Sequence, residues 1–229
     1  MKESLLKRLI SYAWPVEIEV ITSKFSPILE VSLKNGRYRL CTDRVIYSWA
    51  DKYDNFRKCF ERIDLDTPPV SHVLVLGFGL GSISYMLEKT FKKSIKYTGI
   101  EIDEAVIYLT SKYVLDELHS DIELICADAS VFVQQNQIKY DMICIDLFID
   151  DVIPEVFLTT DFLDDVQACL SEKGFLIFNH LYYYEKDKLK AETYYETVFR
   201  PFFEDAGYLD VHMNRMMLSD KKRIYSLKT

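Results

Sequence analysis

Three glycines alternate with other residues just after an apolar run, a spacing typical of a loop that approaches a ligand closely. Gly77, Gly79 and Gly81 follow the run 73–76. Glycine turns tightly and places no Cβ between the backbone and a ligand, and the helix expected next offers free N–H donors. A dinucleotide fingerprint needs a glycine at position 82, which is serine here. The spacing therefore favours a nucleoside without a pyrophosphate, with a plain strand-to-helix turn as the alternative.

Acidic residues end the next two apolar runs. Glu101 lies 20 residues beyond Gly81, where a carboxylate can accept hydrogen bonds from both ribose hydroxyls. Asp103 directly precedes a helical segment, so we expect it to cap that helix. Asp128 could accept from an exocyclic amine of the base, cap the following helix, or do both.

A further aspartate marks the reactive end of the predicted site. Asp146 ends an apolar run at the edge where ligands bind in open α/β sheets, and it could act as a general base or hold a cationic nucleophile. Residues 141–165 contain eight acids and no Lys or Arg, and such a field attracts amines. Asp150 and Asp151 are the candidate amine contacts, whereas a solvated helix face explains the acids from Glu155 onward better. Tyr182 could wall the site or pack its own loop.

Alternating strands and helices must position these residues. After Pro69 the apolar runs are nearly continuous, as expected for parallel strands covered by helices on both faces. Two final strands without a helix between them predict an antiparallel hairpin at the sheet edge. We expect strands at 73–76, 94–102, 122–126, 142–145, 175–179, 208–213 and 223–227, and helices at 81–91, 104–118, 130–135, 155–170 and 187–206. The fold class is therefore α/β, with a methyltransferase-like (Rossmann-like), mostly parallel, seven-stranded sheet that ends in an antiparallel hairpin.

The first 67 residues follow a different, two-residue periodicity. Asn35-Gly36 is a strong signal for a two-residue hairpin turn between alternating runs. The pattern predicts an N-terminal helix, a small β-meander and a closing helix, with strands at 16–21, 28–33, 37–41 and 45–48 and the helix at 49–63. We divide the chain into this region, 1–67, and a nucleoside-binding methyltransferase-like domain, 68–229.

Composition excludes several classes of protein. The 229 residues carry a net charge of −8, and binding to a nucleic acid needs a basic footprint, so we expect no such partner. No run approaches the ~20 apolar residues of a membrane helix, and Lys7 and Arg8 interrupt the N-terminal apolar stretch, so we expect neither a span nor a signal peptide. The five cysteines are odd in number and lack a C-x-x-C motif, and the four histidines are scattered. We therefore expect reduced core thiols, no metal and a cytoplasmic location.

In their order along the chain, these motifs resemble the spermidine synthase family of aminopropyltransferases. VLVLGFGLGS is similar to the family's strand and glycine loop, YTGIEID to its ribose-binding strand, ADAS to its adenine-side loop, YDMICID to the strand that ends in the catalytic aspartate, and SKFSPIL to the stretch before its hairpin. The resemblance implies that Asp146 is catalytic and that S-adenosylmethionine or its decarboxylated form is the co-substrate. The implied nucleoside contacts are Gly77, Gly79, Gly81, Glu101, Asp128 and Ala129. It also implies a homodimer that pairs through the N-terminal region, with a nucleoside and an amine as small-molecule substrates.

Departures from the family pattern gather on the amine side. Leu80 occupies the position of the acid in the family's G-G-G-D-G-G loop, and apolar residues 147–149 follow Asp146 where the family has D-S-S-D-P. The glutamine expected around Ser26 is missing, and residues 51–56 match the D-E-F-x-Y-H/Q segment weakly, without its Tyr and His/Gln pair. Losing a carboxylate that binds an ammonium should cost a few kcal/mol.

The sequence is compatible with two hypotheses about function. In the first, the chain is a transferase that displaces at the sulfonium carbon of its donor, transferring a methyl or an aminopropyl group, with weak or no transfer to putrescine. In the second, it is a catalytically degenerate member that binds a nucleoside or a protein partner. Ser82 and the terminal hairpin disfavour an NAD-dependent oxidoreductase.

Overall fold

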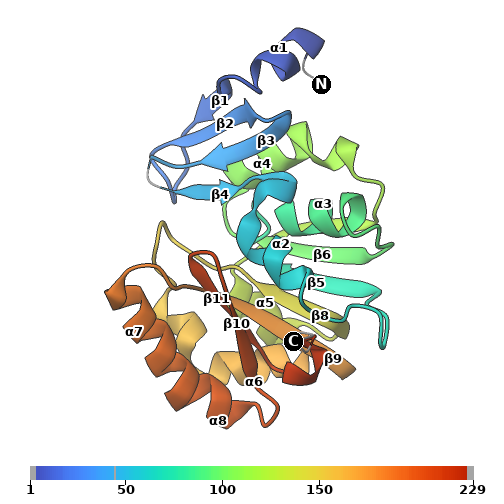
Figure 1. Cartoon of the computed structure of the whole chain (residues 1–229), viewed down its shortest axis with the longest axis vertical. Helices are drawn as coiled ribbons and strands as arrows, with labels where there is room; N and C mark the ends of the chain where they lie inside the picture. The colour runs from blue at the N-terminus through green and yellow to red at the C-terminus, as the bar shows by residue number, and fades with distance from the viewer. Residues whose placement is uncertain (1–3, 44, 226–229) are drawn as a thin grey trace.

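Two β-sheets lie one above the other along the long axis of the molecule (Figure 1). The computed structural model describes residues 4–43 and 45–225. Asn35 and Gly36 adopt φ angles of 53° and 70°, the left-handed values that a tight hairpin turn requires. The smaller sheet is antiparallel and comprises β1 (Val16–Ile21), β2 (Leu29–Lys34), β3 (Arg37–Cys41) and β4 (Ile46–Ser48) in that order. The predicted β-meander is therefore confirmed.

The larger sheet has seven strands in the order β10-β11-β9-β8-β5-β6-β7. Neighbours from β9 to β7 are parallel, whereas β11 runs antiparallel to β9 and to β10. The strands are β5 (His72–Leu76), β6 (Lys96–Glu101), β7 (Ile122–Cys126), β8 (Tyr140–Ile145), β9 (Leu170–Leu181), β10 (Gly207–Val211) and β11 (Asn214–Leu218). This confirms the predicted α/β fold with its mostly parallel sheet and terminal hairpin.

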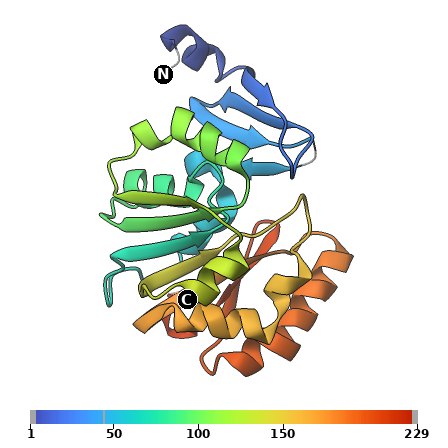
Figure 2. The ribbon, with the colours of Figure 1, turned by 180° about the vertical axis from the view of Figure 1, so that it is seen from behind.

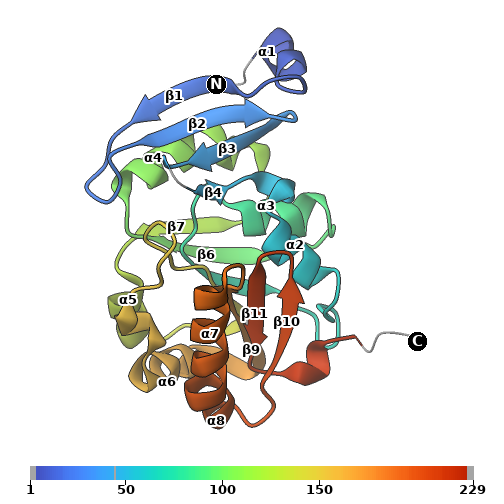
Figure 3. The ribbon, with the colours of Figure 1, turned by 60° about the vertical axis from the view of Figure 1, so that its left-hand side comes forward.

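Helices cover both faces of the larger sheet (Figures 2 and 3). Apolar residues of α2 (Asp54–Phe60) and α3 (Ser82–Lys89) pack on one face. The opposite face is covered by α5 (Ala129–Gln135), α6 (Thr160–Ala168) and α7 (Glu185–Tyr194). Since α2 belongs to the first 67 residues yet packs on the large sheet, the domain division at residue 67 stays a prediction.

A third apolar cluster joins the two sheets. It contains Leu29, Val31 and Leu33 of β2, together with Val106 and Leu109 of α4 (Glu104–Tyr113). Above it, the short α1 (Leu5–Ile10) projects from the end of the smaller sheet (Figure 1). The smaller sheet thus rests on α4 and stands over one end of the larger sheet.

The helix predicted at 49–63 is divided into a 3-10 turn at Ala50–Lys52 and α2, and three further helices are also shorter than predicted. Residues 155–158 form a 3-10 turn before Thr159 caps α6, and α4 ends at Tyr113 before a second 3-10 turn at Leu115–Glu117. The helix predicted at 187–206 changes at Tyr195–Phe199 into a π-helix, followed by α8 (Arg200–Phe202). Pro201 lacks the N–H that an α-helix would need there, which explains the interruption.

The strand predicted at 223–227 is wrong. The hairpin turns at His212, whose φ is 53°, and returns as Asn214–Leu218, so the polar stretch expected to be a turn is a buried strand. Residues 221–223 form a 3-10 turn, and Ile224 makes a single antiparallel bridge with Ile63. Positions 226 and 227 of the predicted strand lie outside the described residues.

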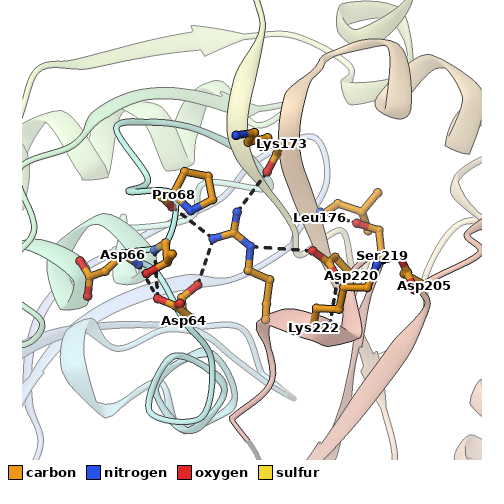
Figure 4. A network of polar contacts seen from close by, with 11 residues as sticks. Asp64, Asp66, Pro68, Lys173, Leu176, Asp205, Ser219, Asp220 and Lys222 are labelled. Atoms are coloured by element: carbon orange, nitrogen blue, oxygen red, sulfur yellow. Dashed lines mark hydrogen bonds and ion pairs between the residues drawn. The ribbon is translucent and has the colours of Figure 1, made fainter.

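A buried arginine fastens this C-terminal segment to the body (Figure 4). The Arg223 guanidinium donates to the carbonyl oxygens of Asp64 at 3.2 Å, Pro68 at 3.3 Å and Lys173 at 3.1 Å. Its charge lies over the Phe175 ring, 4.5 Å from the centroid. One side chain therefore connects the segment before β5, the strand β9 and the C-terminal turn.

Across residues 4–43 and 45–225, no helix is both long enough and apolar enough to cross a bilayer.

Candidate functional site

The candidate site lies at the point in the large sheet where the order of strand addition changes direction: β6 and β7 follow on one side of β5, and β8 and β9 on the other. β5 lies between β6 on one side and β8 on the other, so the loops after β5 and β8 leave neighbouring strands at the same edge. Such a switch point is where open α/β sheets bind ligands. The glycine loop and Asp146 are therefore brought together, as the sequence predicted.

The alternating glycines have a structural reason as well. Gly77, Gly79 and Gly81 all have left-handed φ angles, of 84°, 54° and 73°. A Cβ on Gly77 would lie 2.2 Å from the backbone oxygen of Asp146, which no side chain could tolerate. Close contact between the loop and the end of β8 therefore requires glycine at position 77. Whether the loop also cradles a nucleoside stays a prediction.

Glu101 ends β6 and holds the glycine loop. One carboxylate oxygen accepts from the Gly79 amide at 3.0 Å, and the other accepts from the Asp103 amide at 3.2 Å. Burial raises the pKa of Glu101, although these backbone N–H groups oppose that effect. Each carboxylate oxygen can accept more than one hydrogen bond, so the group retains the capacity to accept from a ribose. Asp103 caps α4 by accepting from the Ala105 amide at 2.9 Å, as predicted.

Asp128 performs the capping role foreseen for it. Its Oδ1 accepts from the Ser130 amide at 2.8 Å, the Ser130 hydroxyl at 2.6 Å and the Val131 amide at 3.3 Å. Burial alone would raise the pKa of Asp128, but these donors outweigh it and lower the pKa. Ala129 is buried as the first residue of α5. All three bonds reach the same oxygen, so the proposed contact to a base stays compatible with capping and stays a prediction.

Asp146 lies between two hydrogen-bond donors. Asn179 Nδ2 donates to Asp146 Oδ1 at 2.8 Å, and the Tyr53 hydroxyl lies near enough to the carboxylate to favour its charged form. Burial raises the pKa of Asp146 to about 6, against the lowering effect of both partners. Burial and the nearby carboxylate raise the pKa of Tyr53 well above its usual value, so the phenol stays protonated. A carboxylate held by neutral donors and titrating near neutrality is suited to accept a proton from a nucleophile.

Three residues of this network were not identified from the sequence: Tyr53, Asn179 and Asn214, whose Nδ2 donates to Asn179 Oδ1 at 2.9 Å. Tyr53 lies inside the weakly matched segment 51–56, where a tyrosine had been expected and was read as absent. Asn179 is the last residue of a predicted strand, so the strand-end rule that selected Glu101 and Asp146 would also have found it. Asn214 lay in the stretch predicted as a turn and carried no signal.

The residues predicted to contact the acceptor, Asp150, Asp151 and Tyr182, do not share one hydrogen-bond network as the residues around Asp146 do. The Asp150 amide donates to the Tyr47 hydroxyl at 3.1 Å, so the loop after β8 reaches β4 of the smaller sheet, while Asp151 is exposed. The Tyr182 hydroxyl donates to Glu192 of α7 at 2.5 Å, and this bond raises the pKa of Tyr182 to about 12. These contacts tie Asp150 to the smaller sheet and Tyr182 to α7. Their predicted role as substrate contacts stays a prediction.

Leu80 does not stand free in the site. It is 3% exposed and belongs to the apolar cluster between β2 and α4. The residue at the family's acid position is thus part of the contact between the two sheets. After Asp146, Phe148 is half-buried and Ile149 is exposed.

Two surface cavities lie away from these residues. One, of about 290 Å³, is lined by Arg8, Lys89 and Glu117, and the other, of about 260 Å³, lies beside Pro68 and Arg223. Within the part of the chain that the structure describes, no three His, Cys, Asp or Glu side chains are placed to hold a metal ion. The five cysteines are free thiols, three of them buried.

The strand order and the glycine loop define an α/β protein of the methyltransferase-like class. Solved structures support this fold. A probable spermidine synthase from Corynebacterium glutamicum matches with a TM-score of 0.71 over 93% of this chain and 82% of its own, at 14% identity. Human methyltransferase-like protein 13, in complex with SAH, matches with a TM-score of 0.56 over 71% of this chain and 78% of its own, at 19% identity.

Within that class, residues 64–205 match the model of the spermine/spermidine synthase domain, so the chain belongs to the spermine/spermidine synthase family. A polyamine aminopropyltransferase of Vibrio vulnificus is 29% identical over 118 residues, which cover 50% of this chain and 39% of that protein. The chain thus spans well under half the length of this curated relative.

Proposed function

We propose that the chain is a transferase that uses S-adenosylmethionine or its decarboxylated form as co-substrate. The adenosyl part would bind at Gly77–Gly81, Glu101, Asp128 and Ala129. The observation that carries the proposal is that the loop held by Glu101 meets Asp146, a carboxylate titrating near neutrality, at one edge of the sheet. Membership in the spermine/spermidine synthase family and the SAH named for the human methyltransferase-like protein support a sulfonium donor.

The chemistry asks little of the protein beyond positioning. A sulfonium carbon is already activated: the nucleophile's electron pair forms the new bond to carbon, the carbon–sulfur bond breaks, and its electrons leave on a neutral thioether. Asp146 would take the proton that an amine nucleophile loses, while Tyr53 and Asn179 hold the carboxylate toward it. Below about pH 6 the carboxyl would be protonated and could no longer accept.

The acceptor is expected to differ from putrescine. A diamine brings two ammonium groups, and an unpaired buried charge costs several kcal/mol. Asp146 would pair with the ammonium group at one end of the diamine. At the position where the family has a second carboxylate, this chain has Leu80, which is apolar and packed between the sheets. We therefore expect weak or no aminopropyl transfer to putrescine, with the methyl or aminopropyl nature of the transferred group left to experiment.

A second candidate function is a catalytically degenerate member that binds a nucleoside or a protein and transfers nothing. The observation favouring it is the same buried Leu80, together with the apolar Phe148 and Ile149 beside Asp146. In its nucleoside-binding form it shares the nucleoside site with the first proposal and differs only on the acceptor side.

Binding and turnover separate the two candidates. Calorimetric titration should show binding of at least one of S-adenosylmethionine, its decarboxylated form, methylthioadenosine or S-adenosylhomocysteine, and none of NAD. At 100 times Kd the ligand should stabilise the fold by about 2.7 kcal/mol in a thermal shift. No adenosyl binding would overturn the transferase and the nucleoside-binding form of the second candidate, leaving a member that binds a protein. Spermidine and methylthioadenosine formed from putrescine at ~1 s⁻¹ or faster would contradict the acceptor prediction.

We further propose a cytoplasmic homodimer that pairs through the N-terminal region and has neither nucleic-acid nor membrane partners. The net charge of −8 supports the absence of a nucleic-acid partner. The apolar side chains of α1, considered below, support the pairing.

A further inference from the structure

We infer that Asn214 is a positioning residue that orients the side-chain amide of Asn179 so that an N–H donor faces Asp146. The inference rests on the proposed function, in which Asp146 is the proton acceptor. It adds a residue from the terminal hairpin, far from the glycine loop in sequence, to the machinery of the site.

Three adjacent strands supply the three side chains. Asp146 follows the last residue of β8, Asn179 lies in β9 and Asn214 begins β11. In the antiparallel pairing of β11 with β9, Asn214 is opposite Leu181, two residues beyond Asn179, so both asparagines lie on the same face. Both are buried. The ladder therefore fixes their backbones and leaves the amide orientation to the hydrogen bonds.

The direction of those bonds decides what Asp146 meets. Asn214 Nδ2 donates to Asn179 Oδ1 at 2.9 Å, which places Asn179 Nδ2 toward Asp146, where it donates to Oδ1 at 2.8 Å. A primary amide has one carbonyl and one NH₂ end. If the Asn179 amide were reversed, its carbonyl oxygen would face a carboxylate and two acceptors would meet without a proton between them. Asn214 opposes this reversal, because its Nδ2 donor would then meet the NH₂ end of Asn179.

Few other ionisable groups near Asp146 could change its pKa in the range where it titrates. The Tyr53 hydroxyl faces it from the segment before α2, and the Cys144 thiol lies two residues back on β8. The neighbouring β5 contributes the backbone of Gly77. Burial raises the pKa of both Tyr53 and Cys144, so each stays protonated through the range in which Asp146 titrates.

The test follows the Asp146 carboxyl by ¹³C NMR titration in the ligand-free protein. Asn214→Leu keeps the shape and removes the donor, which frees the Asn179 amide to turn. Asn214→Asp replaces the donor with a carboxylate that accepts from Asn179 Nδ2 and so reverses the amide. We expect the Asp146 pKa to rise by about one unit in Asn214→Leu and further in Asn214→Asp, since a lost hydrogen bond to the charged form raises a carboxyl pKa.

Controls separate orientation from general charge or packing. Asn136→Asp adds the same charge at the end of α5, where Asn136 bonds to the Ile138 carbonyl, and should leave the Asp146 titration unchanged. In an Asn179→Ala background, Asn214→Leu should have no further effect, because the amide that transmits it is gone. A merely structural role for Asn214 would lower stability in all backgrounds without moving the titration.

The outcomes are decisive in either direction. An unchanged Asp146 pKa in folded Asn214→Leu overturns the inference. If that variant fails to fold, the wild-type protein still tests it: the Asn179 side-chain NH₂ signals must shift with pH in step with Asp146, and signals that do not follow overturn it. A protein that binds no adenosyl compound but shows the expected titrations would refute the transferase proposal while leaving the orientation of Asn179 established.

Discussion

At the scale of single residues, folding disfavours the charged form of the Asp146 carboxyl group. Its pKa rises from 3.8 to about 6 because burial removes water from the charged form more than Asn179 and Tyr53 compensate. The folded state therefore binds the proton more tightly than the unfolded state between these values. Stability consequently falls as pH rises through this window, and the deficit persists above it.

Asp146→Asn should remove that deficit. The neutral amide keeps an oxygen that can accept from Asn179 and carries no charge to desolvate. We expect it to raise the free energy of unfolding by roughly 2 kcal/mol at about pH 8 and by little at about pH 4, where the wild-type carboxyl is protonated when folded. Urea unfolding at both pH values measures this, with exposed Asp164→Asn as the control. A gain equal at both pH values would contradict the explanation.

Glu101 accepts hydrogen bonds from the glycine loop and is also the proposed ribose contact. Glu101→Ala removes the acceptor for the Gly79 and Asp103 amides as well as the proposed ribose contact. We therefore expect adenosyl-ligand binding to be lost while circular dichroism shows an intact fold. The neighbouring Glu104→Ala, exposed in the first turn of α4, should bind normally. Calorimetric affinity unchanged by Glu101→Ala would refute the assignment.

At the scale of elements, the sequence predicted those whose pattern is local. Continuous apolar runs located the parallel strands because both of their faces are covered, and Asn35-Gly36 located the hairpin because its φ angles suit few other pairs. β11 was missed because Asn214 and Arg215 look like turn residues. They are buried because each finds partners outside its own strand: Asn214 bonds to Asn179, and Arg215 pairs with Asp210 and lies over the Tyr182 and Tyr208 rings.

The same reason explains which residues of the site could be predicted from the sequence. Strand-end acids were visible because a carboxylate after an apolar run stands out, so Glu101, Asp128 and Asp146 were selected. Asn179 also ends a predicted strand but is uncharged, so it was passed over, and the approach of Tyr53 to Asp146 depends on how α2 packs on the sheet. Leu80 was recognised as a departure, but its burial between the sheets depends on tertiary packing.

Arg223 allows a prediction about how elements are held together. Arg223→Ala removes donors from the carbonyls of Asp64, Pro68 and Lys173 and leaves them short of a partner. We expect it to destabilise the fold by about 2–4 kcal/mol, since a buried arginine in a network is lost. Arg200→Ala, which breaks an exposed pair with Glu196, should cost less than about 1 kcal/mol. Similar unfolding midpoints for both variants in urea would show that Arg223 does not fasten the C-terminal segment.

At the scale of the whole molecule, α1 is held in place with its apolar side outward. The Ser11 carbonyl and hydroxyl accept from the Asn35 and Gly36 amides at 2.9 Å, and Arg8 pairs with Glu117 at 2.7 Å. No residue of α1 itself is buried. The large apolar side chains exposed on and just after it are Leu5, Leu6, Leu9, Ile10, Tyr12 and Trp14. A six-residue helix is marginal in water on its own, and a gathered apolar surface of this kind marks an interaction site.

A second copy of the chain is the proposed partner for this surface. If it is, the wild-type protein should have a dimeric mass by light scattering at micromolar concentration, and Leu6→Glu with Leu9→Glu should make it monomeric, because two desolvated carboxylates would face the partner. The fold should survive, since both leucines are exposed in the single chain. Leu189→Glu, at an equally exposed apolar position on α7, should leave the mass dimeric. A monomeric wild-type protein, or a dimer that persists in the double variant, would exclude pairing through α1 and leave the β-meander unaffected.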